Sequence, residues 1–165
     1  TGLKWRATSR STAELKVGYN DREYANPAMS SDSNFDFTLR AGHNFSAKTS
    51  MQLYGARRVT ESTTAGTDCI LNHQLSMKYS QTLSQRFIIK LTGTYSQDHF
   101  ENPITVGPLT QEREDKTYIL SPSLEYLTMD WLVVNLSYGL AERDSNFDSF
   151  IFTTNTYLLR ITGYL

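Results

Sequence analysis

Hydrophobic and polar residues alternate along most of this chain with a period of two. In residues 12–19, Leu15 and Val17 fall on one side of the backbone, and Glu14 and Lys16 fall on the other. The same pattern recurs in residues 35–45, 71–79, 87–95, 132–140 and 157–165. Successive side chains of a β-strand point to opposite faces, so this alternation predicts strands with one apolar and one polar face. No helical period competes with it, and we expect an all-β fold.

The alternation predicts nine strands joined by connections that are short and long in turn. The expected strands cover residues 2–7, 12–25, 34–46, 50–62, 69–83, 86–100, 116–128, 131–144 and 149–165. Tight polar connections at 8–11, 47–49, 84–85 and 129–130 alternate with longer ones at 26–33, 63–68, 101–115 and 145–148. The pattern is weakest at 52–59, where Tyr54, Arg57 and Arg58 fit neither face cleanly. The hairpins resemble one another in kind, without a strict sequence repeat.

Three features favour a membrane barrel over a soluble one. Several strands reach about 13–15 residues, whereas soluble strands average ~5–6 and a tilted membrane-spanning strand needs ~9–11. Short turns at one end and longer loops at the other are typical of outer-membrane barrels. Aromatic side chains also gather at two levels, as in the interfacial girdles of such barrels. The girdle candidates are Tyr19, Tyr79, Tyr95 and Tyr138 near long loops, and Phe45, Phe87 and Trp131 near short turns. The alternative is a soluble barrel of the lipocalin type, with its apolar face turned inward.

The number of strands predicts a larger barrel than the chain itself forms. Single-chain bacterial barrels have an even number of strands, with both chain ends in the periplasm. Nine strands would instead place Thr1 toward the outer surface. We therefore expect an antiparallel up-and-down transmembrane β-barrel in which residues 1–165 are the C-terminal part of a single outer-membrane barrel domain. Further barrel strands upstream of Thr1 would then pair with the first strand, since an unpaired edge in lipid costs several kcal/mol per backbone group.

Composition narrows the possible functions. The formal net charge is −1, which gives no basic footprint for nucleic acid. The single cysteine, Cys69, excludes a disulfide framework and a multi-cysteine metal site. The three histidines, His43, His73 and His99, lack the partners and spacing of a catalytic or metal site. The sequence thus predicts no enzyme, no metal and no cofactor, and the charged run at 112–115 predicts a solvated loop.

The polar faces of the strands carry an excess of positive charge that the whole-chain charge conceals. By strand parity the lumen of the barrel would receive Lys4, Arg6, Lys16, Arg40, Lys78, Lys90, Arg160 and one of Arg57 and Arg58, against Glu14, Asp36 and Glu125. Cationic residues that line a pore select anionic solutes. The alternative is that many of these charges pair with carboxylates across the lumen or on other strands.

Six segments of the chain have a recognisable sequence: SPSLEY at 121–126, DWL at 130–132, YGLAERDSN at 138–146, GLKWRATSRST at 2–12, DREY at 21–24 and REDKTY at 113–118. These segments resemble the C-terminal end of the putative β-barrel porin 2 family. The resemblance covers essentially the whole chain, and residues 142–146 are its most specific part. Outer-membrane barrels usually end in Phe or Trp, and the ending Gly163-Tyr164-Leu165 departs from that pattern.

The resemblance implies an outer-membrane β-barrel of a Gram-negative bacterium, of a family often tied to exopolysaccharide export. Together with the cationic lumen, it predicts a channel for an anionic exopolysaccharide. The expected partners are outer-membrane lipid and lipopolysaccharide, the polysaccharide chain and other export components. The alternatives are a general or solute-specific porin, and a barrel that acts as a scaffold around a partner protein.

Overall fold

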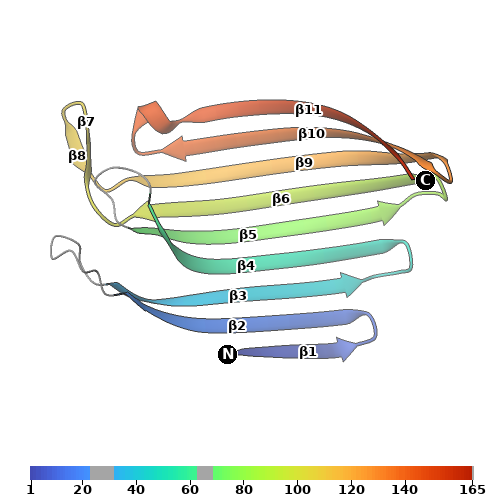
Figure 1. Cartoon of the computed structure of the whole chain (residues 1–165), viewed down its shortest axis with the longest axis horizontal. Helices are drawn as coiled ribbons and strands as arrows, with labels where there is room; N and C mark the ends of the chain where they lie inside the picture. The colour runs from blue at the N-terminus through green and yellow to red at the C-terminus, as the bar shows by residue number, and fades with distance from the viewer. Residues whose placement is uncertain (23–31, 63–68, 165) are drawn as a thin grey trace.

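The computed structural model describes residues 1–22, 32–62 and 69–164, which fold almost entirely into β-strands (Figure 1). The long strands are β1 (Gly2–Thr8), β2 (Ser11–Arg22), β3 (Asp32–Asn44), β4 (Thr49–Glu61), β5 (Cys69–Thr82), β6 (Phe87–Phe100), β9 (Glu114–Met129), β10 (Leu132–Ser145) and β11 (Phe152–Gly163). They form one sheet in the order β1-β2-β3-β4-β5-β6-β9-β10-β11, with each strand antiparallel to its neighbours. The predicted all-β, up-and-down architecture with nine long strands is confirmed. Among the described residues, no helix is able to span a membrane.

The strands run side by side so that the connections gather at two opposite ends of the sheet (Figure 1). The short turns after β1, β3, β5 and β9 lie at one end, which we call the turn end. The longer connections that the structure describes, β6 to β9 and β10 to β11, lie at the other end, which we call the loop end. Those predicted at 26–33 and 63–68 fall largely outside the described residues, as do residues 23–25 of the second predicted strand. β1 and β11 form the two edges of the sheet.

The register aligns the apolar faces of neighbouring strands across the sheet. Leu15 lies opposite Leu3 on one side and Leu39 on the other, while Glu14 lies opposite Arg40 on the polar face. The apolar face covers no core: Leu15 is 40%, Leu39 44% and Leu136 56% exposed. A continuous exposed apolar surface of this size is unstable in water and suits contact with lipid.

The sheet curves around its polar face. A hollow of about 690 Å³ is lined by side chains from six successive strands, from Lys4 on β1 to Thr94 on β6. Most of its lining residues have polar-face parity, so the polar face is the concave side.

The loop end departs from the sequence prediction in two places. Residues 101–115 contain a small hairpin of β7 (Ile104–Val106) and β8 (Leu109–Gln111), which turns at Gly107. Gly107 has φ +61°, a conformation that glycine adopts without steric cost. The last strand begins at Phe152 because residues Asp148–Phe150 form a single 3₁₀ turn.

The prediction that residues 112–115 form a solvated run is wrong for two of its members. Arg113 is 6% exposed and Asp115 is 1% exposed. β9 begins at Glu114, so strand alternation reaches this segment and turns Asp115 to the concave face of the sheet.

Candidate functional site

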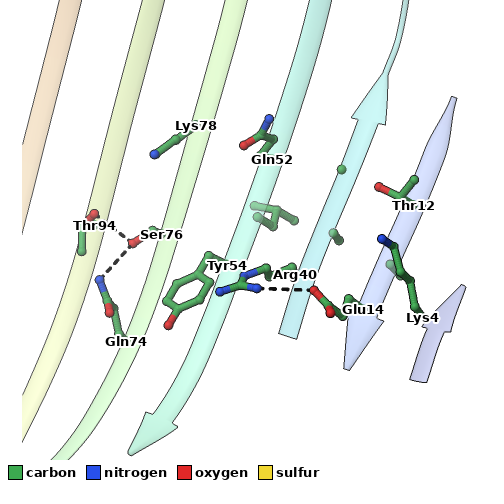
Figure 2. A pocket seen from close by; sticks show the side chains of 14 residues that line it. Lys4, Thr12, Glu14, Arg40, Gln52, Tyr54, Gln74, Ser76, Lys78 and Thr94 are labelled. Carbon is green, nitrogen blue, oxygen red and sulfur yellow. Dashed lines mark hydrogen bonds and ion pairs between the residues drawn. The ribbon is translucent and has the colours of Figure 1, made fainter. Parts of the chain in front are cut away.

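The concave polar face carries charged and hydrogen-bonding side chains close to one another (Figure 2). Around the hollow of about 690 Å³ on this face, neutral hydrogen-bonding groups stand beside cations that project from neighbouring strands. Gln74 Nε2 donates to Ser76 Oγ at 3.4 Å, and Ser76 Oγ lies 3.0 Å from Thr94 Oγ1. The labelled lining residues are Lys4, Thr12, Glu14, Arg40, Gln52, Tyr54, Gln74, Ser76, Lys78 and Thr94.

Some of the cations on this face form ion pairs. Glu14 accepts from two of them, with its carboxylate 3.2 Å from Lys16 Nζ and 3.4 Å from Arg40 Nη1. Lys90 Nζ lies 2.5 Å from Glu125 Oε1. All five side chains lie partly in solvent, so each pair contributes only modestly to stability.

Other cations of the polar face have no such partner. Within residues 1–22, 32–62 and 69–164, no carboxylate lies within ion-pair distance of Lys4, Arg6, Lys78 or Arg160. Register places all the lumen candidates named from the sequence on this one face. Asp36, the remaining acidic candidate, accepts a hydrogen bond from the Val59 amide at 3.2 Å.

The register also assigns the two arginines that the sequence left open. Arg58 pairs with Asn72 and lies on the polar face, whereas Arg57 pairs with His73 and lies on the apolar face. The guanidinium of Arg57 bonds the Phe35 carbonyl and Asn34 Oδ1 near the loop end.

Tyr54 is an aromatic side chain of the polar face that sequence reasoning did not select. Arg58 Nη2 donates to its hydroxyl at 2.5 Å, and Arg40 lies 5.7 Å from its ring centroid. Both guanidiniums flank the half-buried ring. Its position directly opposite Arg40 and Ser76 in the ladder is the signal that would have found it.

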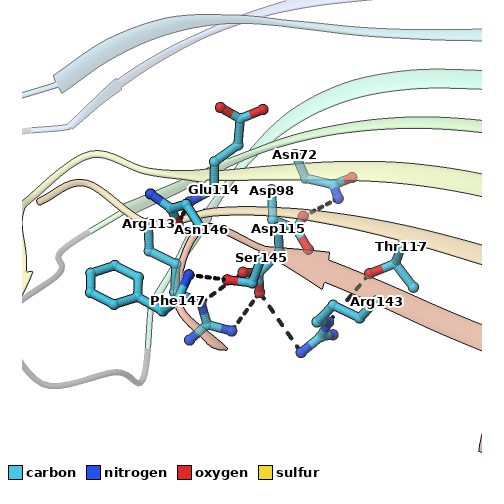
Figure 3. A network of polar contacts seen from close by, with 10 residues as sticks. All are labelled: Asn72, Asp98, Arg113, Glu114, Asp115, Thr117, Arg143, Ser145, Asn146 and Phe147. Atoms are coloured by element: carbon cyan, nitrogen blue, oxygen red, sulfur yellow. Dashed lines mark hydrogen bonds and ion pairs between the residues drawn. The ribbon is translucent and has the colours of Figure 1, made fainter. Parts of the chain in front are cut away.

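A buried polar cluster closes the loop end of the same face (Figure 3). Arg113 makes a two-point contact with the Asp115 carboxylate, and Arg143 Nη1 lies 3.8 Å from the same carboxylate. The Arg113 guanidinium lies between two aromatic rings, 4.5 Å from the centroid of Phe100 and 3.4 Å from that of Phe150. The cluster thereby joins the start of β9 to the β10–β11 connection.

The side-chain amide of Asn146 also links the start of β9 to the β10–β11 connection. Its Oδ1 accepts from the Glu114 amide at 2.9 Å, and its Nδ2 donates to the Glu112 carbonyl at 2.7 Å. The Gln111 side chain donates to the Asn146 carbonyl at 3.3 Å.

Comparison with known proteins identifies the family. The family described as Putative beta-barrel porin 2 matches residues 1–163. The chain belongs to this β-barrel porin family. The family predicted from the sequence is thus confirmed over residues 1–163, and family membership gives the chain an outer-membrane location.

The porin-family chain is also similar to a protein of solved structure. The crystal structure of Ail, the attachment invasion locus protein of Yersinia pestis, is 13% identical and matches with a TM-score of 0.36. The match covers 94% of this chain and 99% of Ail. The comparison with curated proteins gives no match.

The aromatic side chains of this porin-family chain form pairs across neighbouring strands of the apolar face. Toward the loop end, the ring centroids lie 5.3 Å apart in Tyr19–Phe35, 5.1 Å apart in Tyr95–Tyr118 and 5.1 Å apart in Tyr138–Tyr157. Toward the turn end, Phe87 stacks on Tyr126 of the neighbouring strand at 4.7 Å, while Phe45 contacts His43, two residues earlier at the end of β3, at 4.5 Å. Of the other girdle candidates, Trp131 lies at the short turn between β9 and β10. The prediction that Tyr79 lies near a long loop is wrong, because β5 runs from the loop end to the turn end and Tyr79 is three residues from its last residue, Thr82.

Two of the three histidines of the porin-family chain contact nearby polar groups. His43 Nδ1 lies 2.8 Å from Ser11 Oγ, and His99 Nε2 lies 3.3 Å from Glu112 Oε2. No group of three His, Cys, Asp or Glu side chains in the described part of the chain could hold a metal ion. Cys69 is buried at the first residue of β5.

Proposed function

We propose that this protein is an outer-membrane channel of a Gram-negative bacterium that exports an anionic exopolysaccharide. The observation that carries the proposal is the group of polar-face cations without carboxylate partners among the described residues: Lys4, Arg6, Lys78 and Arg160. In this proposal the apolar face meets lipid, the concave polar face lines the passage and the turn end faces the periplasm.

Electrostatics favours anions in such a passage. A low-dielectric wall focuses the field of the cations that line it and raises the local concentration of mobile anions. Rings of Lys and Arg select anionic solutes in pores in the same way. Lys4 and Lys78 line one hollow, with Arg40 between them on the intervening strands, so their fields overlap.

The neutral groups of the same hollow suit a sugar chain. Gln52, Gln74 and Ser76 offer amide and hydroxyl groups that can exchange hydrogen bonds with sugar hydroxyls. The half-buried ring of Tyr54 adds a flat surface with a negative π-face, on which the C–H face of a sugar ring can pack. Cations, hydrogen-bonding groups and one aromatic ring together match a charged polysaccharide better than a simple inorganic anion.

Ion selectivity tests the charge argument. In planar bilayers with a KCl gradient, the intact protein should show a reversal potential on the anion-selective side. The Lys78→Gln/Arg160→Gln variant should shift it toward zero, because it removes two unpaired cations from the polar face. The control is Arg57→Gln/Lys116→Gln, which removes one Arg and one Lys from the opposite face and should leave the potential unchanged. Cation selectivity of the unaltered channel would contradict the proposal.

Secretion tests the substrate. A strain without the protein should lose its extracellular acidic polysaccharide while keeping the uptake of small sugars and anions. The reverse result would identify a solute-uptake porin instead, and loss of neither would favour a scaffold around a partner protein.

A further inference from the structure

Three of the four short turns at the turn end are built in the same way. Each has a hydroxyl residue, then any residue, then a basic residue, and the amide of the basic residue donates to the hydroxyl oxygen. The donor–acceptor distances are 3.1 Å for Arg10 to Thr8, 3.1 Å for Lys48 to Ser46 and 3.2 Å for Arg86 to Ser84. A side-chain hydroxyl that accepts from the backbone two residues later is a common way to fix a tight turn.

The backbone of each basic residue also accepts a hydrogen bond from the neighbouring hairpin. Their carbonyl groups accept hydrogen bonds from the backbone amides of Asn44, Thr82 and Leu127 at 2.9, 2.8 and 2.8 Å, for Arg10, Lys48 and Arg86 respectively. The backbone of each basic residue is therefore fixed on both sides, while its side chain is exposed.

The arrangement recurs regularly along the rim of the sheet. Thr8, Ser46 and Ser84 follow one another at intervals of 38 residues, and each interval contains two strands. Neighbouring strands lie about 4.8 Å apart, which spaces the three basic residues about 10 Å apart. We call Arg10, Lys48 and Arg86 the basic rim.

The fourth turn shows that a hairpin of this sheet closes without a cation. Met129 pairs with Leu132 as Thr8 pairs with Ser11 in the first turn, so residues 129, 130 and 131 occupy the corresponding positions. The Trp131 carbonyl accepts from the Tyr164 amide at 2.8 Å, as the carbonyls of the basic rim accept from their neighbouring strands, and an uncharged residue therefore stands in place of the basic one. β9 and β10 nevertheless pair up to Met129 and Leu132. Closing a turn therefore does not explain the positive charge of the other three.

The basic rim opens toward the polar face. A hollow of about 420 Å³ at the turn end is lined by Arg10 and Lys48 together with Ser50, Ser80 and Thr82. Register places these three hydroxyl residues on the concave polar face. Within the described ranges, no carboxylate lies within ion-pair distance of Arg10, Lys48 or Arg86. The rim cations are thus exposed, unpaired and placed at one mouth of the polar passage.

We propose that the basic rim captures a polyanionic glycan, one that carries carboxylates on successive sugars, as it enters the passage from the turn end. This inference rests on the proposed export function and adds its direction and its first contact. Fixed cations at regular intervals bind a long polyanion at several points at once, and their field accelerates its encounter with the mouth. A small anion would contact one rim residue at a time and gain little from the array.

Blocking of single channels from the two sides tests the inference. Intact protein in a planar bilayer is exposed to tetragalacturonate, added to one chamber at a time at low salt. The turn side is identified afterwards by streptavidin binding to a biotin on a Ser9→Cys variant. For Arg10→Gln/Lys48→Gln/Arg86→Gln, the on-rate of block from the turn side should fall roughly 10-fold, since the steering charges are gone. Block from the loop side should keep its rate, and so should block by neutral maltotetraose from either side.

The controls separate capture from folding and from the export proposal. Arg57→Gln/Lys116→Gln, which removes charge from the opposite face, should block like the unaltered protein. Unchanged unitary conductance and heat-dependent mobility would show that the rim variant is folded. An unaltered on-rate from the turn side, or equal losses from both sides, overturns the inference while leaving the anion selectivity of the channel intact. Reduced insertion into anionic-lipid bilayers with normal block would assign the rim to lipid phosphates and also overturn it. Cation selectivity of the unaltered channel contradicts the export proposal itself.

Discussion

At the scale of single residues, Arg113 and Asp115 show how strand parity overrides the usual behaviour of charged runs. Four consecutive charged residues normally lie in solvent. Here alternation turns Arg113 and Asp115 inward, where aromatic rings and the Arg143 guanidinium surround them. A buried charge is tolerated only with a close partner, because removing either member leaves the other without hydration or compensation. The pair therefore fixes the connection into β9 against the loop before β11.

Loss of one member of this pair should be costly. Arg113→Met should destabilise the protein by roughly 3 kcal/mol, because Asp115 is left in a buried site with only the longer contact to Arg143. The urea midpoint of the membrane-inserted protein measures the change. Lys116→Met is the matched control: its pair with Glu114 at 3.4 Å is exposed and should contribute under about 1 kcal/mol. Equal effects of the two substitutions would show that burial at Arg113 does not matter.

At the scale of elements, the alternation of apolar and polar residues predicted the long strands, but it could not predict the short hairpin or the pairing register. Strand number, order and the two faces follow from alternation over more than ten residues, as in β3 and β10. The β7–β8 hairpin has strands of three residues, too short to show a period. Arg57 and Arg58 are adjacent, so only the pairing register separates them.

The recurring turns were missed for a different reason. The strands between them share parity but not residue identity, since any apolar side chain serves on the outer face. Only the hydroxyl residue and the basic residue two positions later recur in chemical type. Three such pairs, 38 residues apart, are too few to stand out in a sequence of this length. Their common backbone bonds are what make them recognisable.

The orientation of the faces can be tested with two neighbouring residues of β3. Leu39 lies at the middle of this strand on the apolar face, and Thr38 lies beside it on the polar face. Leu39→Lys should cost about 2–4 kcal/mol, because it places a charge in the hydrocarbon. Thr38→Lys should be tolerated, since its side chain meets the polar passage. The folded fraction in the outer membrane, read from heat-dependent mobility, measures both. Better tolerance of Leu39→Lys would mean that the faces are assigned the wrong way round.

At the scale of the whole molecule, the sheet is stabilised by its two environments rather than by a core. Large apolar side chains remain exposed on one face, while cations and hydrogen-bonding groups occupy the other. Such a sheet gains its burial free energy only where lipid covers the first face and water wets the second. The same division concentrates positive charge on the concave side, both midway along the strands and at the basic rim.

The regular turns make a further prediction about how the molecule is assembled. Residues 46–83 begin at one rim turn, contain β4 and β5, and end just before the next rim turn. A second copy inserted after Leu83 would therefore begin with a hydroxyl–x–basic turn, return to the same end of the sheet and preserve the parity of every later strand. We expect this variant to assemble in the outer membrane with two additional strands and, if the protein is a channel, a larger unitary conductance. Insertion of residues 49–61 alone adds one strand and reverses the direction of all that follow, so it should fail to assemble. Assembly of the two-strand variant with unchanged conductance would mean that the added hairpin stays outside the sheet, and that the turns alone do not determine strand pairing.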